Sequence, residues 1–196
     1  GANVIGVGTM RSAVNPDGSV ALDRFIPPTV EISSGGPTED LRSKPDLIAP
    51  GSAIVPQAFS EDGYTTVTNA TSLAAPLTAG AAALLLQYAY EDPTLSAELV
   101  QSPLNCVIKA VLMNSAKKLP YWHKGWISEE DDQTSPLDRL QGAGALDAAA
   151  AKAQLAAGKQ PPGEVRAIGW DSRSLSQMDT FLYLFESPDP NAVLTA

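Results

Sequence analysis

The sequence has 196 residues, of which 44% are hydrophobic, so it is long enough for one folded domain or for one domain and part of another. A formal charge of −9 disfavours nucleic acid and anionic membranes as partners, and a single cysteine excludes an internal disulfide and a cysteine-based metal cluster. The first residues show no signal-peptide pattern, and because Gly1 is not a usual first residue we expect the natural chain to start further upstream.

The first predicted elements are strands. Residues 3–9 form a short run rich in β-branched residues with a glycine-rich exit, which predicts a buried strand. Two weaker strand patterns follow between Met10 and Phe25, on either side of the turn sequence at residues 15–18. We therefore expect a buried strand and then two short strands joined by a tight turn.

The most informative stretch is a short polar segment, residues 68–72, here called the elbow, which leads into a helix of mostly small residues. Thr71 and Ser72 suit the N-cap of this helix, and Pro76 is tolerated only in its first turn. We expect the helix to run from Ser72 to Tyr90, a length of about 28 Å at 1.5 Å per residue. Apolar residues lie on all sides of this helix, which predicts that it is buried in a soluble protein. A membrane span is the competing interpretation, but the apolar run is short for one.

A hydroxyl at the N-terminus of a buried helix is well placed for nucleophilic catalysis. The free N–H groups and the positive end of the helix dipole stabilise negative charge that develops beside the oxygen. Ser72 is therefore a candidate nucleophile. A plain helix cap is the commoner use of such a residue, and both interpretations stay open at this point.

Two further helices are predicted beyond the central one. Residues 104–118 carry apolar side chains at helical spacing, and we expect Cys106 among them to be buried as a small hydrophobic residue. The acidic run at residues 129–132 lacks EF-hand spacing, so a solvated charge run is preferred over a calcium loop. An alanine-rich helix then runs to Ala157, with Gly158 as its C-cap.

The C-terminal part has a different composition. Residues 159–163 are rich in proline and glycine and predict a linker. Strand patterns follow at residues 165–170, 180–185 and 192–195. Three strands are too few to close a core, so we expect the beginning of a β-rich domain.

Four strings in the sequence resemble motifs of one family. Residues 71–84, Thr-Ser-Leu-Ala-Ala-Pro-Leu-Thr-Ala-Gly-Ala-Ala-Ala-Leu, closely resemble the nucleophile segment of the subtilases, the subtilisin-like serine peptidases, which typically reads G-T-S-M-A-A/S/T-P-H-V-A-G-A-A-A-L. Residues 4–9, 33–37 and 44–51 resemble further subtilase motifs and come in the family's order. Ala70 stands where the family usually has glycine, a residue that serves where the backbone needs unusual angles.

The resemblance implies a fold and a site. The fold would be α/β, part of a doubly wound, mostly parallel sheet with helices on both faces. Ser72 would be the nucleophile of an endopeptidase that forms an acyl-enzyme, with its own N–H as one oxyanion donor. Thr68, Asn69, Ala70 and Thr71 would border the substrate channel.

A catalytic serine also needs a base and a group that orients the base. In the subtilases the Asp, the His and the oxyanion Asn lie in upstream motifs, D-T/S-G, H-G-T-H and G-N, and the sequence lacks the first two. His123 fits no such motif and is expected to be a packed loop histidine, and Asn3 is not the oxyanion residue. The chain is therefore expected to be a fragment that is inactive alone.

The resemblance also implies a domain plan and partners. Residues 1–158 would be the C-terminal half of a subtilisin-like catalytic domain, 159–163 a linker, and 164–196 the truncated start of a β-sandwich-like appendage. The expected partners are a polypeptide substrate and the upstream half of the catalytic domain, with no nucleic acid and no membrane. We expect an extracellular, secreted protein without a cofactor or an evident metal site; a structural calcium ion stays open as an alternative that the sequence does not decide.

Two other functions remain open. The chain could be a non-catalytic subtilase-like module that binds peptides in its groove, for which Ala70 is a mild argument and the retained Ser72 a mild counterargument. It could also be a structural or interaction protein in which Ser72 is only a helix cap, and the four ordered motifs count against that interpretation.

Overall fold

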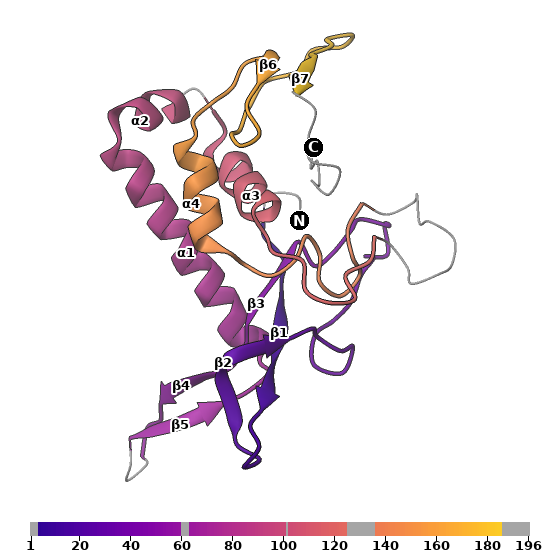
Figure 1. The fold of residues 1–196 in the computed structure, drawn as a ribbon, viewed down its shortest axis with the longest axis vertical. Coiled ribbons are helices and arrows are strands. Elements are labelled where there is room, and N and C mark those ends of the chain that lie inside the picture. The colour runs from indigo at the N-terminus through magenta and orange to yellow at the C-terminus, as the bar shows by residue number, and fades with distance from the viewer. Residues whose placement is uncertain (1–3, 60–62, 101, 125–135, 186–196) are drawn as a thin grey trace. The chain divides into compact units, whose positions relative to one another are not determined.

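The computed structural model describes residues 4–59, 63–100, 102–124 and 136–185 (Figure 1). The chain divides into two compact units, each described by itself below. The first unit consists of Gly1–Ala81 and Ala116–Leu146, and the second of Ala82–Ser115 and Asp147–Ala196.

The first unit is built on a three-stranded mixed sheet in the order β2-β1-β3. Strand β1 (Val7–Val14) pairs in parallel with β3 (Leu47–Pro50) and antiparallel with β2 (Val20–Ile26). The predicted turn at residues 15–18 between two strands is confirmed, but the buried strand expected at residues 3–9 is not separate: its last residues and the first of the two weaker strands form one strand, β1. Met10, Ile48 and Ala145 form a buried apolar cluster of this unit, because β1 and β3 carry consecutive buried residues.

A segment with two glycines, residues 142–146, lies alongside β3 and is hydrogen-bonded to it. The N–H of Ile48 donates to the carbonyl of Gly144 (2.9 Å), and the N–H of Leu146 donates to the carbonyl of Ile48 (2.7 Å). Gly142 and Gly144 both have positive φ, and a Cβ on either would lie within 2.6 Å of a backbone oxygen. Only glycine meets both demands, which explains why positions 142 and 144 are both glycine.

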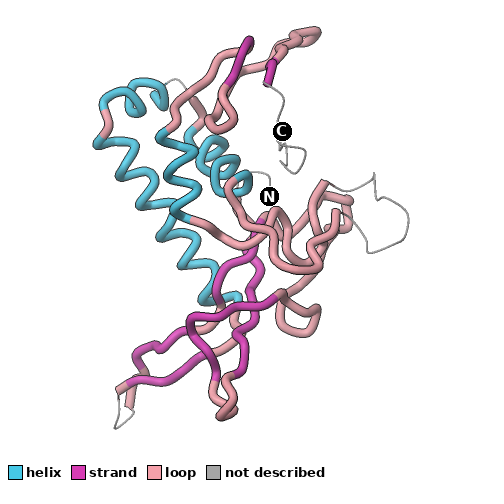
Figure 2. Tube along the Cα trace, viewed as in Figure 1, coloured by secondary structure: helices cyan, strands magenta, loops and turns pink. Residues whose placement is uncertain are grey.

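A two-stranded hairpin leads into the long helix. Strand β4 (Ala53–Pro56) pairs antiparallel with β5 (Tyr64–Val67), and α1 (Thr71–Glu91) begins four residues after β5 (Figure 2). The predicted helix is confirmed to within one residue at each end.

The burial of α1 differs from the prediction. One stripe of the helix is buried, formed by Ala74, Thr78, Ala81, Leu85 and Ala89, whereas Leu84 is 66% exposed. The prediction of a helix buried on all sides is wrong because most of its apolar residues are alanine and glycine, whose exposure costs little free energy. Helix α1 is long and apolar enough to span a membrane by length and composition, a criterion that core helices of other proteins also meet.

The second unit contains the shorter helices α2 (Pro93–Val100), α3 (Leu104–Asn114) and α4 (Ala148–Ala156). Helices α3 and α4 lie side by side (Figure 1). Asp147 caps α4 by accepting a hydrogen bond from the N–H of Ala150 (2.9 Å), and Gly158 has the positive φ of a glycine that ends a helix. Cys106 is exposed, so the prediction of a buried thiol is wrong: α3 turns Val107, Ile108, Val111 and Leu112 inward instead.

The C-terminal residues are bonded into the second unit. The N–H of Lys159 donates to Glu98 (3.0 Å), and the indole of Trp170 donates to the carbonyl of Leu155 (3.2 Å). Strand β6 (Gly163–Val165) pairs in parallel with β7 (Tyr183–Phe185), and the third predicted strand lies outside the described residues. The architecture is α/β; the complete doubly wound sheet, the β-rich appendage and the predicted domain boundaries stay predictions.

Candidate active site

The elbow has a well-defined backbone at the start of α1. Asn69 has a φ of 56°, in the left-handed region, whereas Ala70 is not among the described residues with positive φ. The carbonyl of Ala70 accepts hydrogen bonds from the N–H groups of Leu73 (3.0 Å) and Ala74 (3.3 Å). An alanine in place of the family's usual glycine therefore fits here, because the left-handed conformation falls on asparagine, which tolerates it.

These bonds identify Ala70 as the N-cap, since its carbonyl accepts the first intrahelical bond. Thr71 and Ser72 lie in the first turn, so the prediction that they cap the helix is wrong. Pro76 is the sixth helical residue and lies beyond the first turn, so the prediction that it lies within the first turn is wrong. Ser72 is exposed and presents its hydroxyl and N–H at the positive end of the helix dipole.

Three hydrogen bonds attach the elbow to β1 and to the two residues between β3 and β4. The N–H of Ala70 donates to the carbonyl of Gly51 (2.8 Å), and the N–H of Asn69 donates to the hydroxyl of Ser52 (3.1 Å). The Oδ1 atom of Asn69 accepts a bond from the N–H of Ser12 in β1 (3.1 Å). The elbow is thus bonded both to β1 and to the segment that leaves β3.

The packing under the elbow is tight at Gly51. A Cβ on this residue would lie 1.6 Å from Oγ1 of Thr9 and 3.0 Å from the carbonyl oxygen of Ala70. Thr9 itself is fully buried in β1. Glycine at position 51 allows the backbone of the elbow to approach β1 closely.

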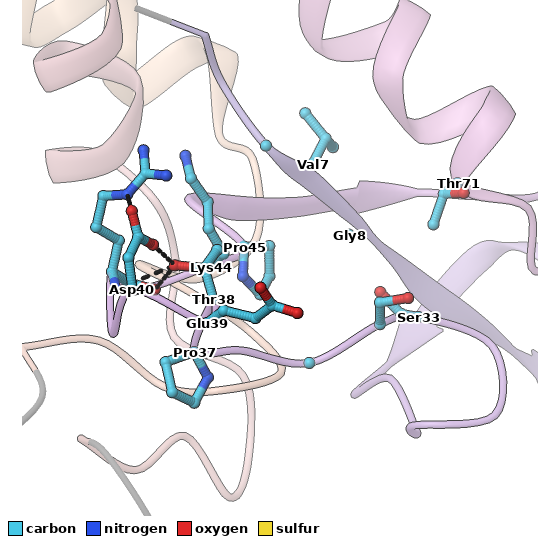
Figure 3. A pocket seen from close by; sticks show the side chains of 14 residues that line it. Val7, Gly8, Ser33, Pro37, Thr38, Glu39, Asp40, Lys44, Pro45 and Thr71 are labelled. Atoms are coloured by element: carbon cyan, nitrogen blue, oxygen red, sulfur yellow. Dashed lines mark hydrogen bonds and ion pairs between the residues drawn. The ribbon is translucent and has the colours of Figure 1, made fainter. Parts of the chain in front are cut away.

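An open cavity of about 920 Å³ reaches the first residue of α1. Its lining comes from Gly6, from Val7 and Gly8 of β1, from residues of the 33–45 loop, and from Thr71 (Figure 3). The hydroxyl of Ser33 accepts a hydrogen bond from the N–H of Thr9 (3.1 Å), which joins this loop to β1. The rim carries both charge signs, with Asp40 paired to Arg42.

The predicted site residues therefore lie together, with different exposure. Thr68, Thr71 and Ser72 are exposed, while Asn69 and Ala70 are half-buried. The sequence did not identify Ser12, Gly51 and Ser52, which hold the elbow from distant positions. The position of Asn69 just before the start of a helix could have indicated the sharp backbone turn there, because asparagine favours the left-handed conformation.

His123 lies in a loop of the first unit and is hydrogen-bonded there through its backbone. The N–H of His123 donates to Asp138 (2.7 Å), and its Nδ1 is buried without a hydrogen-bond partner among the described residues. Residues 129–132 lie outside the described part of the chain. Within the described part, no three His, Cys, Asp or Glu side chains form a group that could hold a metal ion.

We compared the sequence with those of known proteins and with models of protein families. C5a peptidase from Streptococcus pyogenes serotype M18 (strain MGAS8232) is 37% identical over 122 residues, which is 62% of this chain and 9% of that protein. The serine protease/ABC transporter B family protein tagD from Dictyostelium discoideum is 34% identical over 105 residues, 44% of this chain and 6% of that protein. The chain thus spans less than a tenth of the length of these curated relatives. A model of the subtilase family matches residues 2–144, and the chain therefore belongs to the subtilase family.

Proposed function

We propose that the chain supplies the nucleophile of a serine endopeptidase. The observation that carries the proposal is the exposed Ser72 in the first turn of α1, at the end of an elbow that is bonded to β1 and to Gly51, in a chain of the subtilase family. The Ser72 oxygen attacks the carbonyl carbon of a peptide bond, the amine leaves with a proton, and water hydrolyses the resulting acyl-enzyme. The relatives named above are a peptidase and a serine protease, which supports this reaction class.

The surroundings of Ser72 suit this reaction. The first intrahelical bonds of α1 are donated by Leu73 and Ala74, so the N–H of Ser72 lies ahead of the helical ladder. We assign it as one donor to the oxyanion that forms during attack. Thr68, Asn69, Ala70 and Thr71 border the substrate channel in this proposal, and the bound substrate is a polypeptide.

The remaining catalytic groups belong to a partner segment in this proposal. The D-T/S-G, H-G-T-H and G-N motifs of an upstream half supply the orienting Asp, the basic His and the oxyanion Asn. That half completes a doubly wound sheet and covers the apolar side of α1, where Leu77 is 46% and Leu84 66% exposed. The family also favours an extracellular protein that needs no cofactor, nucleic acid or membrane, with a β-rich appendage after residue 163.

One observation weakens each of the alternatives. A plain helix cap at Ser72 is disfavoured because the carbonyl of Ala70 already accepts the first intrahelical bonds. A peptide-binding module without catalysis drew its support from Ala70, and the negative φ of that residue removes the backbone argument. The binding module is kept as an outcome of the following test.

The test is labelling of Ser72 by a fluorophosphonate probe. This chain is refolded with a separately expressed upstream segment that carries the three motifs, and each chain alone is treated in parallel. We expect labelling of the mixture only, its loss in Ser72→Ala, and no change in the control Ser174→Ala, which alters an exposed serine of the second unit. A folded mixture that stays unlabelled would replace the peptidase by the peptide-binding module.

A further inference from the structure

We infer that Asn69 is a positioning residue for Ser72, an assignment that rests on the proposed function. Asn69 touches neither the reacting carbonyl nor the Ser72 oxygen in this assignment. It fixes the direction in which the chain enters α1, and so where the Ser72 hydroxyl lies.

The backbone of Asn69 supplies the first part of the argument. Its φ of 56° turns the chain sharply between β5 and α1. Most residues pay a steric penalty in this region, and asparagine and glycine pay the least. The turn falls three residues before Ser72, so a change in its angles redirects the first turn of the helix.

The side chain of Asn69 supplies the second part. Its Oδ1 accepts the N–H of Ser12, 57 residues earlier in the chain, at 3.1 Å. The bond joins the elbow to β1, which is the central strand of its sheet and pairs with both β2 and β3. A half-buried side chain bonded to a sheet strand holds the left-handed turn in one conformation.

The backbone N–H groups complete the anchor. Asn69 donates to Ser52, and Ala70 donates to Gly51, so two consecutive peptide units are fixed to the segment after β3. Asn69 is the residue that takes part from both its backbone and its side chain. Reactive groups held within about 1 Å of the productive position are worth about 10²-fold in rate, which is the scale of the effect expected here.

Three variants separate the two parts. Asn69→Asp keeps the acceptor oxygen and tolerance of the left-handed turn, Asn69→Gly keeps only the backbone freedom, and Asn69→Ala loses both. The control is Asn105→Ala, which changes an exposed asparagine in the first turn of α3. All four are combined with the upstream segment and compared with the parent.

The measured quantities are the rate of fluorophosphonate labelling and the separate kcat and KM for a peptide substrate. We expect Asn69→Ala to lower the labelling rate and kcat by about 10²-fold with a much smaller effect on KM, and we expect the labelling rate to fall less in Asn69→Gly and least in Asn69→Asp. Asn105→Ala should match the parent. Equal labelling of all variants, or a rise in KM at constant kcat, overturns the inference and makes Asn69 at most a substrate contact.

A second measurement keeps the inference separate from the proposed function. If the folded parent itself does not label, the peptidase proposal fails, and amide hydrogen exchange of the 196-residue chain then decides the role of Asn69. Asn69→Ala should speed exchange at Ser12 and across residues 69–74, with no change in α3 and α4, and Asn69→Asp should restore the parent pattern. Unchanged exchange in Asn69→Ala would refute the anchor as well.

Discussion

The N–H of Ala70 donates a 2.8 Å hydrogen bond to the carbonyl of Gly51, so the segment after β3 and the elbow are in direct backbone contact. The string that ends at Gly51 and the string that contains Ser72 lie far enough apart in sequence to enclose a whole hairpin, β4 and β5. Their contact explains physically why the two strings belong to one site. The strand positions the elbow, and the elbow presents the serine.

Gly51→Ala should destabilise the first unit. The added methyl group would lie 1.6 Å from Thr9 Oγ1, and overpacking of this kind costs about 1–3 kcal/mol. Gly80→Ala is the matched control: its added methyl group would meet no atom within 4 Å beyond the adjacent helix backbone, and alanine favours a helix over glycine by about 0.5–1 kcal/mol. Urea midpoints should therefore move in opposite directions, and a Gly51→Ala midpoint equal to that of the parent would contradict the close packing.

The 196-residue chain alone should hydrolyse no peptide above background. A base that accepts the serine proton contributes about 10²–10⁴-fold to such reactions, and the sequence contains no H-G-T-H motif to supply it. Casein hydrolysis is measured for the purified chain beside Ser72→Ala. Activity that disappears in Ser72→Ala would show that the chain contains its own base.

The isolated chain should bind a hydrophobic dye and self-associate. Leu77 and Leu84 are exposed on α1 and lie seven residues apart, which puts them on the same side of the helix. Leu84→Gln should lower dye binding more than Leu41→Gln. Leu41 is also exposed (81%), but it lies on a loop and is not part of the apolar side of α1. A monomeric chain with a cooperative melt and no dye binding would disprove the exposed apolar surface.

Acid should weaken the second unit through Asp171. Burial acts to raise the pKa of this carboxyl, but hydrogen bonds from the Tyr183 hydroxyl (2.7 Å) and from Arg173 Nε (2.6 Å) outweigh burial and lower its pKa. A lowered pKa in the folded state means that the stabilisation is present above the ordinary carboxyl pKa of about 4 and is lost as the pH falls through the lowered value.

The corresponding experiment compares unfolding midpoints between pH 7 and pH 3. Asp171→Asn should be less stable than the parent at pH 7 and should respond less to acid, whereas Asp23→Asn, which changes an exposed residue of β2, should follow the parent. An unchanged acid response in Asp171→Asn would mean that other carboxylates govern it.

Strands and helices can be predicted where local pattern decides them. Helix α1 is rich in alanine and leucine, which are strong helix formers, so its predicted bounds lie close to the observed ones. The burial of α1 cannot be predicted, because it depends on which elements pack against it. Short α2 has no counterpart among the predicted elements.

Only the part of the candidate site that is continuous in sequence can be predicted. Ser72 and its neighbours form one continuous string, so their proximity follows from sequence. The bond from Ser12 to Asn69 spans 57 positions and involves a backbone N–H, which every residue except proline has. No side-chain pattern can reveal such a partner, and for the same reason the sequence does not show that Ala70 fits its position.

Pro76 gives the start of α1 a particular mechanical character. A regular helix would pair the carbonyl of Ser72 with the N–H of residue 76, and proline has no N–H to offer. The carbonyl of Ser72 therefore lacks its regular helical partner, whereas the N–H of Leu73 in the same peptide unit donates to the carbonyl of Ala70. With one helical bond fewer at this end, the position of Ser72 depends more on the hydrogen bonds that hold the elbow to Ser12 in β1 and to Gly51.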